Sequence, residues 1–187
     1  MDKVLILTEN WQILKKAMPG KKEDREAMKR IHVTEKWIYV TNGRIAVRMI
    51  RDHASIKDPG TYEIISAGKG ESAGFTALIL ERDEINTFPD VGRVFPEKDG
   101  GEHVMIELFP AKDDSGLSIS KAMIDLYKHT GNAFNYTILE ILASNRYGWS
   151  AHKQGERGAG GAAYLKSTDH TAEAVILPFR APFRADQ

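Results

Sequence analysis

A segment with a proline near each end, Phe88-Pro-Asp-Val-Gly-Arg-Val-Phe-Pro96, places the strongest constraint on how this chain can fold. Proline lacks a backbone donor and clashes with a preceding helical turn, so the segment can neither continue a helix nor lie in a central strand. It also carries four apolar side chains, Phe88, Val91, Val94 and Phe95. We therefore predict an extended connector (residues 88–98) that these side chains hold in place between two halves, 1–87 and 99–187, of one compact domain.

The first half begins with the pattern of a short strand followed by a helix. Residues 3–7 read as a strand, and Thr8 then offers a side-chain oxygen as a helix N-cap. Pro19-Gly20 ends the helix. Between these limits, apolar residues recur at helical spacing: Trp11, Leu14 and Met18. A charged segment of mixed sign, 21–26, follows and is typical of a solvated loop.

From Met28 the hydrophobic period becomes that of strands. The pair Asn42-Gly43 predicts a hairpin with a type I′ turn, in which both central residues have positive φ. Two further strands complete the half after the turn at Asp58-Pro-Gly60. The strands expected in this half span residues 31–35, 37–41, 44–50, 61–65 and 75–80.

The second half repeats this order of elements, without repeating the sequence. A strand at 103–109 precedes a helix capped by Ser120, with Ile119 and Ile124 placed as a hydrophobic staple. The helix ends near Gly131, after cations suited to its C-terminal dipole. The strands expected next span residues 134–142, 148–152, 162–166 and 172–179. We therefore predict an α+β fold in which each half places one helix against an antiparallel sheet.

The composition excludes several classes of function. Lys plus Arg and Asp plus Glu both number 26, so no global charge points to nucleic acid or membrane, and a DNA-facing surface would need charges segregated between faces. There is no cysteine, which excludes disulfides, thiolate zinc sites and cysteine nucleophiles. The first residues have too short an apolar run for a signal peptide, and no run reaches membrane-spanning length. We expect a soluble, cytoplasmic protein with no membrane partner.

No motif predicts catalysis, a metal or a cofactor. The six histidines are scattered, without the spacing of a metal site. The glycine-rich stretches 67–74 and 155–161 lack the features of phosphate-binding loops and read as hairpin loops. The carboxylate clusters at 81–84 and 113–114 fit exposed turns better than acid-base chemistry. We predict that the protein is not an enzyme; the open alternative, an enzyme acting on a nucleotide, has no supporting constellation.

Cations on the two predicted helices offer one candidate surface. Lys121, Asp125 and Lys128 share a face of the second helix, and Lys15 and Lys16 lie on the first. Two helices with basic outer faces could follow a phosphate backbone without reading bases. An ordinary solvated face is the alternative.

Several of these motifs resemble the bacterial replicative sliding clamp, the β subunit of DNA polymerase III. The connector 88–96 resembles that family's Phe-Pro-Asp-aromatic-x-Arg-Val-x-Pro segment, although Val91 stands at the aromatic position. Residues 117–126 resemble its last helix, and Val175-Ile-Leu-Pro-Phe-Arg180 resembles its closing Val-x-Met-Pro-Met-Arg. Residues 38–46 resemble a strand, turn and strand of the family.

The resemblance implies a clamp fold with both helices on the DNA side of a ring and the sheet outside. It also implies an apolar cleft that receives short peptides from replication or repair proteins. By matching positions, the cleft residues are Pro89, Val94, Val175, Leu177 and Phe179. Core packing is the alternative role for these five side chains.

Two functions follow from the resemblance. The first is a clamp-like processivity or tethering factor that self-assembles and holds double-stranded DNA non-specifically, with Lys15, Lys16, Lys121 and Lys128 facing phosphate. The second is a clamp-fold adaptor that keeps the cleft and does not encircle DNA. A bacterial clamp subunit has three such domains and this chain has material for one, so a ring would need more copies than the family's dimer.

Overall fold

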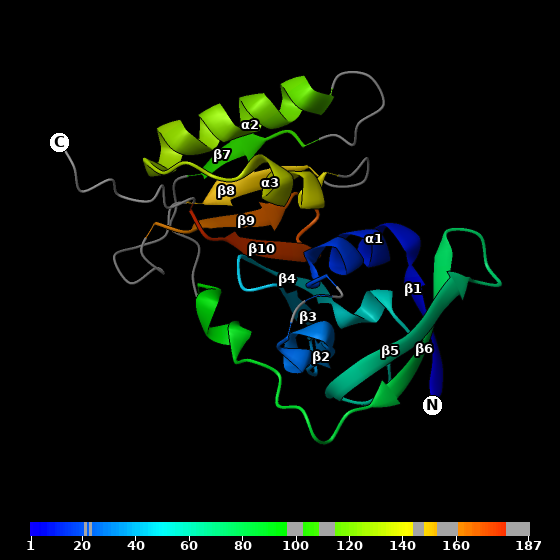
Figure 1. Ribbon diagram of the computed structural model, residues 1–187. Helices are drawn as coiled ribbons and strands as arrows, with labels where there is room; N and C mark the ends of the chain where they lie inside the picture. The colour runs from blue at the N-terminus through cyan, green and yellow to red at the C-terminus, as the bar shows by residue number, and fades with distance from the viewer. Residues whose placement is uncertain are drawn as a thin grey trace.

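The computed structural model describes residues 1–20, 22, 24–96, 103–108, 115–143, 148–152 and 161–178. Its ten strands form one antiparallel sheet in the order β1-β6-β5-β2-β3-β4-β10-β9-β8-β7 (Figure 1). The first-half strands are β1 Asp2–Leu7, β2 Ile31–Val33, β3 Trp37–Thr41, β4 Ile45–Ile50, β5 Gly60–Lys69 and β6 Phe75–Arg82. Those after the connector are β7 His103–Ile106, β8 Trp149–His152, β9 Ala163–Ser167 and β10 Ala172–Ile176.

Within the described residues, three α-helices lie on one side of this sheet: α1 Thr8–Ala17, α2 Ser115–Thr130 and α3 Tyr136–Leu142. Helix α1 packs on β1, β3, β4 and β6, while α2 packs on β7, and α3 contacts both other helices (Figure 1). The α+β fold with helices on one face of an antiparallel sheet is therefore confirmed. The division into halves stays a prediction, since the sheet runs continuously across it.

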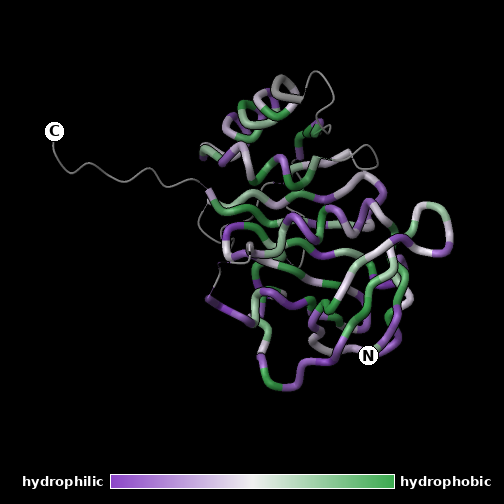
Figure 2. Tube along the Cα trace, turned by 45° about the vertical axis from the view of Figure 1, so that its right-hand side comes forward, coloured by the Kyte–Doolittle hydropathy of each residue, from purple (hydrophilic) through white to green (hydrophobic). Residues whose placement is uncertain are grey.

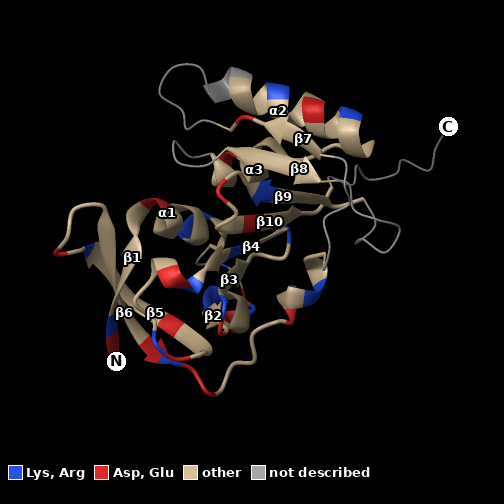
Figure 3. Cartoon of the chain, turned by 180° about the vertical axis from the view of Figure 1, so that it is seen from behind, with Lys and Arg blue, Asp and Glu red and all other residues tan. Residues whose placement is uncertain are grey.

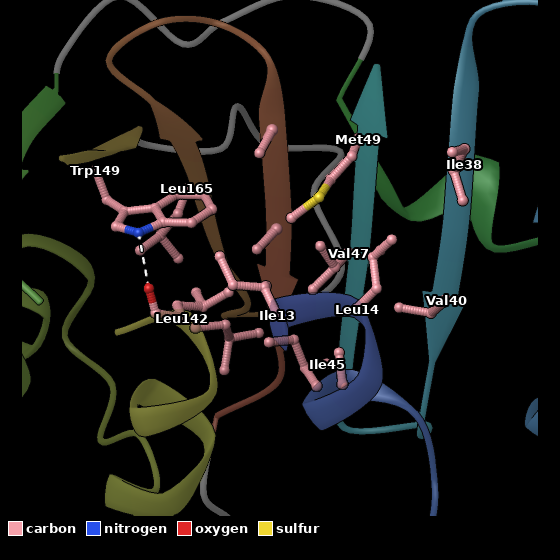
Figure 4. Close-up of a cluster of buried hydrophobic side chains, with 14 of the residues drawn as sticks. Ile13, Leu14, Ile38, Val40, Ile45, Val47, Met49, Leu142, Trp149 and Leu165 are labelled. Atoms are coloured by element: carbon pink, nitrogen blue, oxygen red, sulfur yellow. Dashed lines mark hydrogen bonds between the residues drawn. The ribbon is translucent and has the colours of Figure 1, made fainter. Parts of the chain in front are cut away.

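The core on the helix side follows from alternation along the strands. Ile38 and Val40 of β3, and Val47 and Met49 of β4, point to this side and pack under Leu14 of α1 (Figure 4). Figure 2 shows the hydrophobic residues recurring along the strands of the sheet. Because side chains of a strand alternate between faces, the intervening residues of the same strands face the opposite side.

Helix α3 corrects one sequence prediction, because residues 134–142 were expected to form a strand. Asn135 caps the helix, accepting a hydrogen bond from the Thr137 backbone N–H at 2.8 Å. Its buried residues, Ile138, Leu139 and Leu142, recur at helical spacing. An apolar run this short fits the period of a helix and that of a strand equally well, so the pattern alone could not distinguish them. The carbonyl of Leu142 accepts from the buried indole N–H of Trp149 at 3.1 Å (Figure 4).

The ends of the other two helices also differ from the prediction. Helix α2 begins at Ser115, so Ser120 lies inside it, and Ile124 is 54% exposed and forms no staple with buried Ile119. Thr8 makes no capping bond in α1, and its hydroxyl accepts from the Thr76 hydroxyl at 3.1 Å.

The Asn42-Gly43 hairpin forms, but without the predicted type I′ turn. Of the two residues only Gly43 has positive φ, at 82°. The Asn42 side-chain oxygen instead accepts from the backbone N–H groups of Arg44 and Ile45, at 2.9 and 3.1 Å. An Asx turn of this kind lets Asn keep negative φ, so the strand pairing was right and the turn type wrong.

The described part of the connector, residues 88–96, covers the sheet face opposite the helices. Phe88 and Phe95 are buried there, in a cluster with Trp37, Tyr39 and Tyr164. The segment is not extended throughout, because Val91–Val94 forms one turn of 3₁₀ helix. The strands in the middle of the sheet are thus covered on both faces.

A buried ion pair joins the two parts of the sheet under the connector. Arg48 of β4 and Glu173 of β10 lie opposite each other in the strand register, and the Arg48 Nε donates to Glu173 at 2.8 Å. The guanidinium lies 4.5 Å from the Trp37 ring centre and 4.3 Å from that of Phe95. Arg48 therefore links the first half, the last strand and the connector.

We expect Arg48→Ala to lower the free energy of unfolding by about 3–5 kcal/mol, because Glu173 would remain as an unpaired buried carboxylate. The matched control is Arg93→Ala, which removes an exposed connector arginine paired with Asp90 and should cost less than about 1 kcal/mol. Urea unfolding followed by circular dichroism measures both. Equal losses in the two variants would contradict a structural role for the Arg48 pair.

Candidate functional site

The described surface holds an apolar groove of about 410 Å³ on the side of the sheet covered by the connector. One wall comes from the connector, the floor from the joined ends of β4 and β10, and the other wall from the segment that precedes β2. Nine apolar residues border it, although the side chain of Ile45 belongs to the core on the helix side: Ala27, Met28, Ile45, Ala46, Pro89, Val91, Val94, Val175 and Leu177. The groove also has Arg25, Thr41, Gly43 and Arg44 along its lining.

Four of the five predicted cleft residues lie together in this groove. Pro89 and Val94 come from the connector, and Val175 and Leu177 from the end of β10. Val175 is buried, Val94 is half-buried, and Leu177 is 42% exposed. The fifth, Phe179, lies outside the described residues. Leu177 is exposed as a groove residue would be, whereas Val175 belongs to the buried cluster with Trp37 and Tyr39, so the cleft role of these residues stays a prediction.

The connector wall is fixed from beneath by its two aromatic residues. Phe88 stacks on His32 of β2, with ring centres 5.3 Å apart and planes 8° apart. Phe95 meets Tyr39 of β3 edge to face at 6.0 Å. Burial lowers the pKa of His32, while the nearby Asp90 carboxylate opposes this effect. With both ends anchored, Val91 and Val94 are left to face the groove.

A charged cluster fixes the start of the connector. Asp83 accepts from the backbone N–H groups of Ile85 and Asn86, both at 2.9 Å, and from Arg30 Nε at 2.6 Å. The hydrogen bond from the Asn86 backbone, followed by that from Arg30, holds the pKa of Asp83 well below its usual range. Asp83 therefore stays ionised and orders the turn that leads from β6 into the connector.

The floor of the groove depends on the last bonds of the β4–β10 ladder. Val175 pairs with Ala46, and the Leu177 backbone N–H donates to the Arg44 carbonyl at 2.9 Å. Residues more than a hundred positions apart in the chain thus form one surface. The opposite wall, with Arg25, Ala27 and Met28, was missed from the sequence, because Arg25 lies within the charged segment 21–26, which reads as a solvated loop, and the other two residues follow it directly.

The four predicted DNA-facing lysines are all exposed and lie on the helix side of the sheet. Lys15 and Lys16 occupy the last turn of α1. On α2, Lys121 forms a 2.9 Å ion pair with Asp125, and this hydrogen bond raises the pKa of Lys121. Figure 3 shows basic and acidic positions interspersed along α2. Lys128 lies one turn further along the same helix.

The structure does not merge these lysines into one basic surface. Helix α3 lies between α1 and α2 and adds the exposed Glu140, and α2 exposes Ile124 and Tyr127 between its two lysines. The helix layer is therefore a mixed surface with basic positions at its two ends. Within the described residues, no group of three or more histidine or acidic side chains could hold a metal ion.

Comparison with solved structures gives one consistent result. The sliding clamp of Pseudomonas aeruginosa superposes with a TM-score of 0.55 at 10% identity, over 96% of this chain and 66% of that one. The DNA polymerase III β subunit of Borrelia burgdorferi gives 0.59 at 10% identity, over 97% and 63%. That of Streptococcus pneumoniae gives 0.55 at 11% identity, over 97% and 65%.

This chain has the fold of a bacterial sliding clamp. The clamp fold confirms the resemblance that the sequence motifs indicated, although the chain covers less than two thirds of each of these proteins. Neither a protein-family model nor a curated protein sequence matches it. Across the described residues, no helix is both long and apolar enough to span a membrane.

Substitutions at two neighbouring residues, Ile176 at the end of β10 and Leu177 directly after it, can distinguish a core side chain from a groove side chain. Ile176→Ala should cost about 2–5 kcal/mol of unfolding free energy, because Ile176 is fully buried on the helix side. Leu177→Ala should cost less than about 1 kcal/mol, because its side chain is partly exposed in the groove. Thermal or urea unfolding of the two variants checks this. A Leu177 loss as large as that of Ile176 would assign the groove residues to the core.

Proposed function

We propose that this protein is a non-catalytic, clamp-like tethering factor that captures short peptide segments of replication or repair proteins in the groove. One observation carries the proposal: four residues chosen by matching clamp motifs line a single apolar groove together with the strand-end backbone. Apolar pockets beside strand ends suit an extended peptide, whose alternate side chains can enter the groove. The clamp fold is consistent with a role that needs no catalytic residues.

The proposed function includes contact with double-stranded DNA through the helix layer. The exposed lysines of α1 and α2 would meet phosphates without reading bases. Several copies would have to assemble to surround a duplex. The second candidate is an adaptor that uses the groove and does not encircle DNA, and the mixed charge of the helix layer favours it.

Peptide capture can be tested with a fluorescent synthetic peptide that carries the clamp-binding segment of a bacterial polymerase. We expect Leu177→Ala to weaken binding about tenfold or more, because an anchor pocket would lose its apolar contact. Phe179→Ala should act in the same direction. The matched control is Met105→Ala, which removes a 52% exposed methionine from β7 and should leave binding unchanged. Fluorescence anisotropy gives the dissociation constants, and equal binding by Leu177→Ala and the unmodified protein would reject the groove as the site.

DNA association should depend on Lys15 and Lys16 and on salt. The double variant Lys15→Ala/Lys16→Ala should weaken binding to a random-sequence duplex and reduce the dependence of log affinity on log salt by about two. Lys36→Ala is the control, because Lys36 lies over the Trp37 ring on the connector side of the sheet. Anisotropy titrations at several salt concentrations supply the slopes. Unchanged slopes would remove α1 from the DNA surface.

Gel filtration with light scattering separates the two candidates. The encircling factor requires a molar mass of several chains at high protein concentration. A strict monomer under those conditions excludes the ring and leaves the adaptor.

A further inference from the structure

The turn between β3 and β4 brings together the groups of a spontaneous ring-closing reaction. It holds the one Asn-Gly pair of the sequence, Asn42-Gly43, and Gly43 is exposed with a φ of 82°. In such a pair the backbone nitrogen of the glycine can attack the side-chain carbonyl carbon of the asparagine and close a five-membered ring. The two groups belong to one chain and need no encounter, so the local geometry decides how fast they react.

The side-chain carbonyl of Asn42 is held by donors that favour this attack. Its Oδ1 accepts from the backbone N–H groups of Arg44 and Ile45, at 2.9 and 3.1 Å. Negative charge develops on Oδ1 when its carbon is attacked, and fixed N–H donors that point at a developing oxyanion lower the barrier. The Asx turn therefore polarises the carbonyl that it holds.

The attacking nitrogen, that of Gly43, carries no side chain that would crowd the closing ring. Its N–H donates to the hydroxyl of buried Thr41 at 3.0 Å, and that hydroxyl donates to the Ile45 carbonyl at 2.8 Å. The nitrogen must lose this proton to hydroxide before it attacks. The bond to Thr41 therefore slows the reaction without preventing it, and the rate rises with pH.

Asn135 offers an internal comparison, because it has similar donors and a different neighbour. Its Oδ1 accepts from the backbone N–H and the hydroxyl of Thr137, at 2.8 and 2.6 Å. The next residue, Tyr136, has a side chain and begins α3. Asn135 thus has a polarised carbonyl without a glycine nitrogen beside it.

We propose that Asn42-Gly43 is a spontaneous modification site, at which Asn42 of the folded protein is converted to aspartate and isoaspartate. The deprotonated Gly43 nitrogen bonds to Asn42 Cγ, the bond from Cγ to the side-chain nitrogen breaks, and ammonia leaves. Water then opens the succinimide ring. Opening at Cγ gives aspartate, and opening at the backbone carbonyl gives isoaspartate. The net reaction exchanges ammonia for water and needs no enzyme or oxidant.

The two products differ in their effect on the β3–β4 hairpin. Aspartate keeps the acceptor oxygen and makes charge-assisted bonds to the same N–H groups, so the turn persists. Isoaspartate adds one methylene to the backbone between Thr41 and Gly43, which disturbs the pairing of Thr41 with Ala46. It also displaces the Arg44 carbonyl, which accepts from Leu177 at 2.9 Å. Isoaspartate therefore loosens the attachment of β10 at this turn, and aspartate does not.

The test incubates the folded full-length chain in mildly alkaline buffer made with oxygen-18 water, followed by digestion and mass spectrometry. We expect Asn42 to be modified at least about tenfold faster than Asn135, because only Asn42 is followed by a residue without a side chain. Each modified chain should gain one labelled oxygen, and mildly acidic buffer should slow the reaction. Asn42→Gln should abolish the modification, whereas Asn135→Ala should leave the rate at Asn42 unchanged.

Three results would overturn the proposed site. They are equal rates at Asn42 and Asn135 in the folded protein, modification of Asn42 only after unfolding in urea, and a modified product without labelled oxygen. The isoaspartate product, separated by chromatography, should unfold at a lower temperature than the Asn42→Asp variant. Equal unfolding temperatures would overturn the predicted effect on the hairpin.

Discussion

The pairing of β4 with β10 is the interaction on which the rest of the structure depends. It connects a strand from residues 45–50 with one from residues 172–176, and without it the sheet would divide into a six-stranded and a four-stranded part. The pairing also places Val175 beside Ala46 and Leu177 beside Arg44, so it creates the floor of the groove. The Arg48–Glu173 ion pair crosses the same ladder and is covered by Phe95. One long-range contact therefore supports both the fold and the candidate site.

The aromatic and the aliphatic side chains of the connector occupy different environments. The aromatic rings of Phe88 and Phe95 are buried against the sheet, where their large area favours anchoring. The smaller Val91 and Val94 are only half-buried and form the groove wall. Because the two anchors flank the single 3₁₀ turn, the wall is held at both ends. A segment that lacks regular strand pairing can in this way present a defined surface.

The sequence predicted local structure well wherever a strong short-range signal existed. Strand β3 was predicted at its observed bounds, 37–41. Alternation of its residues indicated a strand, and the Asn42-Gly43 turn set its C-terminal end. Helix α3 was missed because seven residues with three buried apolar side chains fit either period, and packing against α1 and α2 decided the outcome. The motif match named groove residues on both the connector and the last strand. No local pattern could add Arg25 or Met28, whose place in the groove depends on long-range pairing.

The two candidate surfaces lie on opposite faces of one sheet, and this arrangement constrains how the protein can work. The helices occupy one face, while the connector and the groove occupy the other. A peptide in the groove would therefore not compete sterically with a duplex against α1 and α2. Their coupling would have to pass through the sheet, whose central strands are buried on both faces and closely packed. Such a core resists deformation, so the proposed tether would hold its two ligands independently, and its strength would come from linking them through one rigid layer.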